Sequence, residues 1–175
     1  MSRTGFVGLG GNLGDRRATL QVAVDALPGA GVEPVQSSSV YATAAVGGPP
    51  GQPEFLNACL RVETALEPEE LLDALKAIER AAGRAEEGQP GYVHHGPRTL
   101  DLDVLLLGDE RYASDHLTVP HPALTERRFV LVPLLELDFG LALPDGSPLA
   151  DALARLPLDA DVRRASPPLR LRRDR

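Results

Sequence analysis

The order in which hydrophobic periodicity changes along the chain constrains its fold more than any other feature. Strand-like apolar runs alternate with two stretches that have the three-to-four-residue spacing of an amphipathic helix. Glycine and proline clusters separate these segments. They follow one another as strand, helix, strand, strand, helix and strand, over residues 6–9, 15–27, 35–43, 55–64, 68–82 and 99–107.

This order is typical of an α+β domain with helices packed on an antiparallel sheet, and we expect a ferredoxin-like arrangement. C-terminal additions follow: a helical segment over 124–137 in two pieces around Arg127 and Pro133, and a short helix capped by Ser147. The length of 175 residues suits one domain. We predict that residues 1–156 form this domain. We expect 157–175 to be a mobile basic tail whose removal leaves function unchanged.

Composition argues against several classes of function. The formal net charge of −7 disfavours broad binding to nucleic acid or to an anionic membrane surface. No apolar run reaches the ~18 residues of a membrane span. The single cysteine, Cys59, excludes an internal disulfide and a multi-cysteine zinc site, and it fits a cytoplasmic protein. Lys76 is the only lysine and follows no glycine-rich loop, which excludes a P-loop.

Asp101 and Asp103 are the strongest candidates for chemistry. Both lie in the otherwise apolar run 99–107, and residues two apart on a strand share a face, with Cα atoms about 6.6 Å apart. Two carboxylates beside a core need a compensating cation, and Mg²⁺ takes such ligands together with phosphate oxygens. The alternative is a half-exposed strand with a polar face. Arg98, three residues before Asp101, favours a functional pair.

Other polar residues have two interpretations each. His121, held between prolines, could donate to a phosphate or could be a structural turn residue. Phe55 and Asn57 share a strand face, so they could stack on a heterocycle and bond its edge, or they could be a core ring beside a strand-end amide. Three arginines could bind phosphate in a bidentate manner, although each alone also suits a solvated surface: Arg84, Arg98 and Arg127.

The glycine-rich segment 8–14 follows a strand and opens a helix, as dinucleotide-binding fingerprints do. However, Leu13 stands where the third glycine belongs, and the later chain lacks regular strand–helix alternation. We therefore reject a Rossmann interpretation.

Four motifs in this order resemble a known family. They are Gly10-Gly11-Asn12-Leu13-Gly14-Asp15, Phe55-Leu56-Asn57-Ala58, Gly96-Pro97-Arg98-Thr99-Leu100-Asp101-Leu102-Asp103, and Val119-Pro120-His121-Pro122 with Arg127 and Phe129 after it. Over about residues 4–148 the chain resembles the 6-hydroxymethyl-7,8-dihydropterin pyrophosphokinases of folate biosynthesis. The resemblance implies transfer of pyrophosphate from ATP to the pterin hydroxymethyl group, with release of AMP.

The resemblance also implies roles for individual residues. Asp101 and Asp103 would hold two Mg²⁺ ions, and catalysis would rest on them together with Arg84 and Arg98. The ATP site would comprise Lys76, Glu79, Arg84, Arg98, His121 and Arg127. The pterin site would comprise Thr43, Val46, Phe55, Asn57 and Phe129. Asn12 would support the site, residues 84–98 would form a lid, and Asp103 is the candidate for a general base. We expect a monomer that binds small molecules.

Two alternatives belong to other classes. A non-catalytic ferredoxin-like module would predict a disrupted carboxylate pair or disrupted lid arginines, but the sequence retains them. An RNA-binding sheet would need exposed aromatic residues and a basic face, whereas aromatic residues make up 4% of the chain. One departure from the family concerns the lid, where His95 stands in the place of a common tryptophan, so the closed lid should pack differently.

Overall fold

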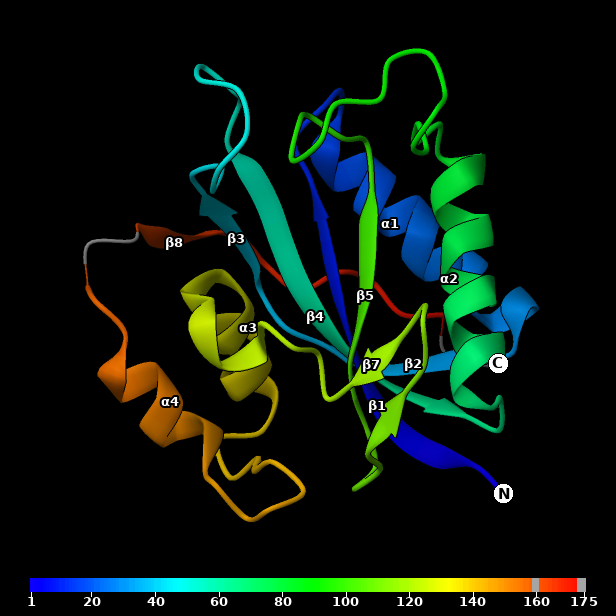
Figure 1. Cartoon of the computed structure of the whole chain (residues 1–175), viewed down its shortest axis with the longest axis vertical. Coiled ribbons are helices and arrows are strands. Elements are labelled where there is room, and N and C mark those ends of the chain that lie inside the picture. The colour runs from blue at the N-terminus through cyan, green and yellow to red at the C-terminus, as the bar shows by residue number, and fades with distance from the viewer. Residues whose placement is uncertain (159–160, 173–175) are drawn as a thin grey trace.

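An antiparallel sheet runs through the computed structural model, which describes residues 1–158 and 161–172 (Figure 1). Its strands are β1 (Arg3–Gly11), β2 (Val32–Ser37), β3 (Val40–Thr43), β4 (Phe55–Thr64), β5 (Asp101–Leu107) and β8 (Val162–Ser166). They are ordered β5-β1-β4-β3-β8, and β2 pairs with β4. This order confirms the predicted α+β, ferredoxin-like arrangement. The short strands β6 (Tyr112–Ala113) and β7 (Thr118–Val119) form a separate two-stranded sheet.

Helices cover both faces of the sheet (Figure 1). On one face lie α1 (Arg16–Ala26) and α2 (Pro68–Ala81), and on the other lie α3 (Arg128–Leu137) and α4 (Leu149–Arg155). Two short 3₁₀ helices, η1 (Pro28–Ala30) and η2 (Leu124–Glu126), complete the set. The Asp15 side chain caps α1, as predicted, by accepting from the Ala18 N–H at 3.1 Å. None of the helices described is long and apolar enough to cross a bilayer.

The alternation of side chains on β5 positions the polar site. Leu102 and Val104 point into the core beneath α1 and α2. Leu105 points to the opposite face and packs with residues of α3. Asp101 and Asp103 share that second face, since strand side chains repeat every two residues. There they are only partly buried.

Two long connections leave the sheet at the same end, at the top of Figure 1. The first loop comprises residues 44–54, between β3 and β4, and the second loop comprises residues 84–98, between α2 and β5. Gly83, with a φ of +84°, ends α2 and starts the second loop, as the sequence predicted. The carboxylates of β5 therefore lie directly below both loops.

The structure corrects three local predictions. The first is the cap of the last helix: α4 begins after Pro148, and no side chain among the described residues, Ser147 included, caps it. The strand expected over 35–43 is two strands, because the chain turns at Ser38 and Ser39, where Glu136 of α3 accepts from the Ser39 N–H at 2.8 Å and from its hydroxyl at 2.6 Å. The helix over 124–137 does break at Arg127, which is extended, but it continues through Pro133. Packing of the buried leucines around Pro133 offsets the missing backbone donor.

The prediction of a mobile tail over 157–175 is wrong for its described part. β8 pairs antiparallel with β3 and extends the sheet past the predicted boundary at residue 156. Leu169 is 3% exposed and lies in the same core as α1. Arginine-rich composition suggested a solvated chain, but backbone pairing and one buried leucine order it instead. Residues 159–160 and 173–175 of that prediction lie outside the described residues.

Candidate active site

The strand register places two glycines of β1 between polar residues of β4 and polar residues of β5. On β1, Gly10 lies opposite Asn57 of β4 on one side and Asp101 of β5 on the other. Gly8 lies in the same way beside Asp103. Since neighbouring strands are about 4.8 Å apart, the backbones of Asn57 and Asp101 stand about 10 Å apart, with Gly10 between them. The Asn57 side-chain oxygen leans over Gly10, 2.7 Å from where a Cβ of residue 10 would stand, and the Leu105 side chain covers Gly8.

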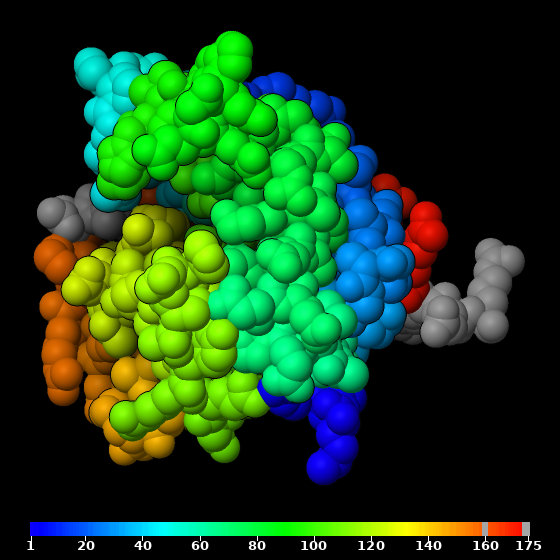
Figure 2. Space-filling view, turned by 45° about the vertical axis from the view of Figure 1, so that its right-hand side comes forward, coloured from blue at the N-terminus to red at the C-terminus, as the bar shows by residue number. Residues whose placement is uncertain are grey.

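The residues predicted for the site gather around two neighbouring cavities. The first cavity, of about 550 Å³, opens below the second loop and beside α3, where Figure 2 shows a hollow. The second cavity, of about 350 Å³, lies beside α2 and β7. The first is lined by Thr43, Val46, Phe55, Asn57, Arg84, Arg98, Asp101, Asp103, His121, Arg127 and Phe129. The second is lined by Lys76 and Glu79, and it shares Arg84, Asp101, Asp103 and His121 with the first. Every predicted site residue therefore lines one of these two cavities.

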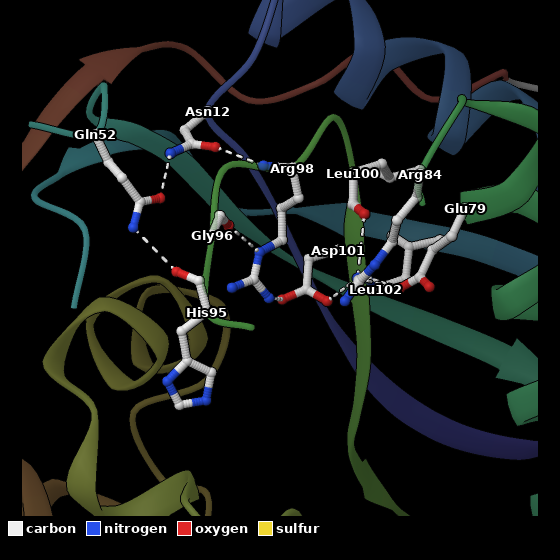
Figure 3. A network of polar contacts seen from close by, with 10 residues as sticks. All are labelled: Asn12, Gln52, Glu79, Arg84, His95, Gly96, Arg98, Leu100, Asp101 and Leu102. Atoms are coloured by element: carbon white, nitrogen blue, oxygen red, sulfur yellow. Dashed lines mark hydrogen bonds and ion pairs between the residues drawn. The ribbon is translucent and has the colours of Figure 1, made fainter. Parts of the chain in front are cut away.

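A cluster of charges lies where the two cavities meet (Figure 3). Arg84 forms ion pairs with Asp101 and, at 3.2 Å, with Glu79. Arg98 approaches the other oxygen of Asp101 at 3.3 Å. Burial raises the pKa of Asp103 to about 7, and repulsion from Asp101 and Glu79 adds to the effect. Two arginines thus neutralise one carboxylate, while the second carboxylate is left with a strong demand for positive charge.

The donor chemistry of this cluster fits a hard divalent cation. Asp101 and Asp103 offer carboxylate oxygens on one face of β5. Within residues 1–158 and 161–172, no three histidine, cysteine, aspartate or glutamate side chains are grouped closely enough to form a metal cage on their own. A cation here would complete its shell with ligand oxygens. Two protein carboxylates plus substrate phosphates is a typical set for Mg²⁺.

His121 is held by two hydrogen bonds to the backbone of other residues. Its backbone N–H donates to the Leu105 carbonyl at 3.0 Å, and its ring Nδ1 accepts from the Ala123 N–H at 3.1 Å. The proton of the neutral ring is therefore on Nε2, which is free to donate. Burial, and then the positive charge of Arg127, lower the pKa of His121, so the ring is neutral near pH 7. The Arg127 guanidinium lies 5.7 Å from the centre of the Phe129 ring at the wall of the first cavity.

The opposite wall offers an amide and a second aromatic ring. The side-chain Nδ2 of Asn57 donates to the Thr43 hydroxyl oxygen at 2.6 Å, and both residues are at least nine-tenths buried. This bond leaves the Asn57 carbonyl oxygen and the Thr43 hydroxyl proton available to a ligand. The Arg98 guanidinium lies 5.7 Å from the centre of the Phe55 ring. The first cavity can therefore both stack on a heterocycle and bond its edge.

Gln52, which sequence reasoning missed, connects the two loops (Figure 3). It accepts a hydrogen bond at 3.3 Å from Asn12, the residue that the resemblance expects to support the site, and Asn12 accepts from the Arg98 N–H at 2.8 Å. Gln52 in turn donates to the His95 carbonyl at 3.0 Å. The end of β1 and both loops are thus connected. A lone glutamine in a glycine- and proline-rich loop gives no sequence signal for such a role.

Known proteins resemble this chain over most of its length. The family described as 7,8-dihydro-6-hydroxymethylpterin-pyrophosphokinase matches residues 6–139. A relative from Pseudomonas aeruginosa is 41% identical over 157 residues, which cover 88% of this chain and 92% of the relative. A relative from Bacillus subtilis is 42% identical over 138 residues, or 78% of this chain and 79% of the relative. Both are named 2-amino-4-hydroxy-6-hydroxymethyldihydropteridine pyrophosphokinase.

Solved structures agree on the fold. The crystal structure of Plasmodium falciparum HPPK-DHPS with pterin and p-hydroxybenzoate superposes with a TM-score of 0.62 at 13% sequence identity. The match covers 89% of this chain and 42% of that one, so this chain spans about two fifths of its length. At this identity the match speaks for the fold alone. With the family match over residues 6–139 and the identity to full-length relatives, the chain belongs to the 7,8-dihydro-6-hydroxymethylpterin-pyrophosphokinase family.

Proposed function

We infer that this chain transfers the pyrophosphoryl group of ATP to the hydroxymethyl oxygen of 6-hydroxymethyl-7,8-dihydropterin. The products are AMP and the pterin pyrophosphate, an intermediate of folate biosynthesis. Membership of the family and the names of relatives that match most of this chain support this reaction.

The observation that carries the proposal is the position of Asp101 and Asp103. They line both the first and the second cavity. A ligand in each cavity would therefore bring its reacting group to the same two carboxylates. Attack of a hydroxyl on the β-phosphorus needs alignment and charge neutralisation more than a covalent intermediate. Two cavities that meet at a charged cluster supply both.

We assign the first cavity to the pterin. Asn57 and Thr43 would bond the polar edge of the ring, and the rings of Phe55 and Phe129 would pack on or near its faces. Val46 stands on the first loop at the cavity wall and is 71% exposed, and we assign its backbone to contact the ring.

We assign the second cavity to the nucleotide. His121, neutral and with its proton on Nε2, would donate to a phosphate oxygen. Arg127, whose charge acts on His121 from the wall of the first cavity, would add positive charge. Lys76 is exposed on α2 and would reach the outer part of the nucleotide. Glu79 is 8% exposed and accepts from the Leu102 N–H at 2.7 Å, so it also holds α2 against β5.

We propose that Asp101 and Asp103 hold two Mg²⁺ ions together with the ATP phosphates. When bound, these ions would neutralise phosphate charge and orient the β-phosphorus. Arg84 and Arg98 pair with the same carboxylate that a cation would take. They would therefore exchange Asp101 for phosphate oxygens when the nucleotide binds. The second loop, which carries Arg98, would then exclude water that competes as acceptor.

We further propose that the enzyme acts as a monomer in the cytoplasm. Light scattering coupled to gel filtration checks the mass. A stable dimer would overturn the monomer proposal.

Product analysis tests the reaction. The protein is incubated with ATP, Mg²⁺ and 6-hydroxymethyl-7,8-dihydropterin, and the nucleotides are resolved with time. We expect AMP and pterin pyrophosphate in equal amounts, and only when both pterin and Mg²⁺ are present. ADP would indicate simple phosphoryl transfer. Absence of any nucleotide product from folded protein that still binds Mg-ATP would favour the binding-module alternative.

A further inference from the structure

The chain beyond the matched family region pairs with β3, which lines the first cavity, assigned above to the pterin. Residues 161–171, here named the C-terminal brace, lie outside the matched residues 6–139. Within the brace, β8 lies along the free edge of β3, with Val162 opposite Thr43 and Arg163 opposite Ala42 (Figure 1). Thr43 is the residue that accepts the Asn57 amide. The brace therefore forms the outer support of a strand whose inner side faces the first cavity.

An ion pair connects the brace to the start of β4. One nitrogen of Arg163 lies 2.8 and 2.9 Å from the two carboxylate oxygens of Glu54, and Arg163 also pairs with Asp161. Glu54 immediately precedes Phe55. From the other side, Arg16 of α1 donates to the Glu54 carbonyl at 2.7 Å. The end of the first loop is thus held on both sides. Since Arg163 and Glu54 are each about half exposed, this pair alone contributes little, and it acts together with the strand pairing.

The far end of the brace is anchored in the core. Leu169 is 3% exposed, and its N–H donates to the Ser37 hydroxyl at 3.1 Å. Arg170 and Gln21 of α1 exchange two hydrogen bonds, at 2.8 and 2.9 Å. Arg17 of α1 donates to the Ser166 hydroxyl at 2.8 Å. These bonds to α1 and β2 hold β8 in register with β3.

The polar contacts of the brace are confined to one half of the site. Its hydrogen bonds and ion pairs lead to α1, β2, β3 and Glu54. In the part of the chain that the structure describes, none of them reaches a residue that lines the second cavity. A change in the brace should therefore displace Thr43 and Phe55 more than it displaces Lys76 or His121.

We propose that the C-terminal brace is a positioning element for the pterin: it holds Thr43 and Phe55 in place and so sets pterin affinity separately from nucleotide affinity. The proposal rests on the assignment of the first cavity to the pterin. It adds a function for residues that the sequence alone describes as a solvated tail.

The test compares two ligands in a small set of variants. A chain ending at residue 160 removes the brace. Arg163→Glu reverses one side of the ion pair, and Arg163→Glu with Glu54→Arg restores it with opposite polarity. Arg155→Glu, at an exposed position on α4, is the matched charge control. Pterin binding is followed by the fluorescence of 6-hydroxymethylpterin in the presence of Mg²⁺ and a non-hydrolysable ATP analogue. Binding of the Mg-nucleotide analogue alone is followed by calorimetry.

We expect the shortened chain to bind the pterin about tenfold more weakly, equivalent to ~1.4 kcal/mol. Arg163→Glu should weaken pterin binding by about threefold, within the range of exposed ion pairs, and the charge-swapped double variant should recover it. Nucleotide affinity should stay within about twofold throughout, and Arg155→Glu should match the unmodified chain.

Two results would overturn the proposal. One is an unchanged pterin affinity in folded variants, and the other is an equal loss of pterin and nucleotide affinity, which would mean a general structural role. If the shortened chain does not fold, as circular dichroism would report, the ion-pair variants decide alone. If the unmodified chain itself binds no pterin, it is the proposed function that fails. Failure of the brace proposal requires an unmodified chain that does bind pterin.

Discussion

Substitution of Gly10 by alanine should damage pterin binding while sparing the fold. A Cβ atom at this position would lie 2.7 Å from the side-chain oxygen of Asn57, whereas ordinary contacts begin near 3.4 Å. The Asn57 amide would have to retreat by about 0.7 Å. Because the obstacle is the end of a side chain, the backbones of β1 and β4 can stay paired. The displaced group, however, is the one that we assign to the edge of the pterin.

The expected change in stability is smaller than the expected change in pterin affinity. Weakening the 2.6 Å bond from Asn57 to Thr43 would lower the free energy of unfolding by about 1 kcal/mol. Replacing glycine by alanine returns about 0.4–1 kcal/mol by restricting the unfolded chain. Stability should therefore change by less than about 1 kcal/mol. A pterin edge buried without its partner loses about 1–3 kcal/mol of binding free energy, or roughly fivefold to 150-fold in affinity.

The assay pairs thermal unfolding with a fluorescence titration of 6-hydroxymethylpterin, and calorimetry measures the Mg-nucleotide analogue. Gly29→Ala is the matched control, because a Cβ there meets no atom within 4 Å. It should leave both affinities unchanged. If Gly10→Ala folds and binds pterin as tightly as the unmodified chain, or loses nucleotide affinity by the same factor, Asn57 does not bond the edge of the pterin.

Three further predictions concern the charged cluster and the loops. Asp101→Ala and Asp103→Ala should each lower kcat at least about a thousandfold, ~4 kcal/mol, and weaken Mg-ATP binding in folded protein; near-normal turnover in both would exclude the metal assignment. Arg98→Ala should lower kcat about a hundredfold with little change in pterin affinity, and a loss confined to affinity would contradict its transition-state role. Asn12→Ala should destabilise the fold by about 1–3 kcal/mol and speed amide exchange in both loops, and unchanged exchange would show that its bonds do not hold them.

Sequence reasoning succeeds where local chemistry decides the structure. The two-residue period of β5 places Asp101 and Asp103 on one face, and the first and last residues of β4, Phe55 and Thr64, lie where the apolar pattern predicts. Capping by Asp15 and the stop at Gly83 are also local signals. These features are readable because they depend on neighbours within a few residues.

The features that sequence reasoning misses depend on distant partners. The break between β2 and β3 requires Glu136, 97 residues further on, to bind Ser39. The link between the loops requires Gln52 to meet His95, 43 residues away. β8 is ordered because β3 has a free edge and the core has room for Leu169. No local sequence pattern indicates which distant residues will come into contact.

The oxygen of the pterin hydroxymethyl group reports directly on the site of attack. The substrate is prepared with ¹⁸O at that position, and the products formed with ATP and Mg²⁺ are read by ³¹P NMR and mass spectrometry. Attack of the hydroxyl on the β-phosphorus predicts that the label is retained in the pterin pyrophosphate, bound to phosphorus, and that AMP is unlabelled. Loss of the label from the pterin product, or ADP in place of AMP, would exclude attack of the hydroxyl on the β-phosphorus.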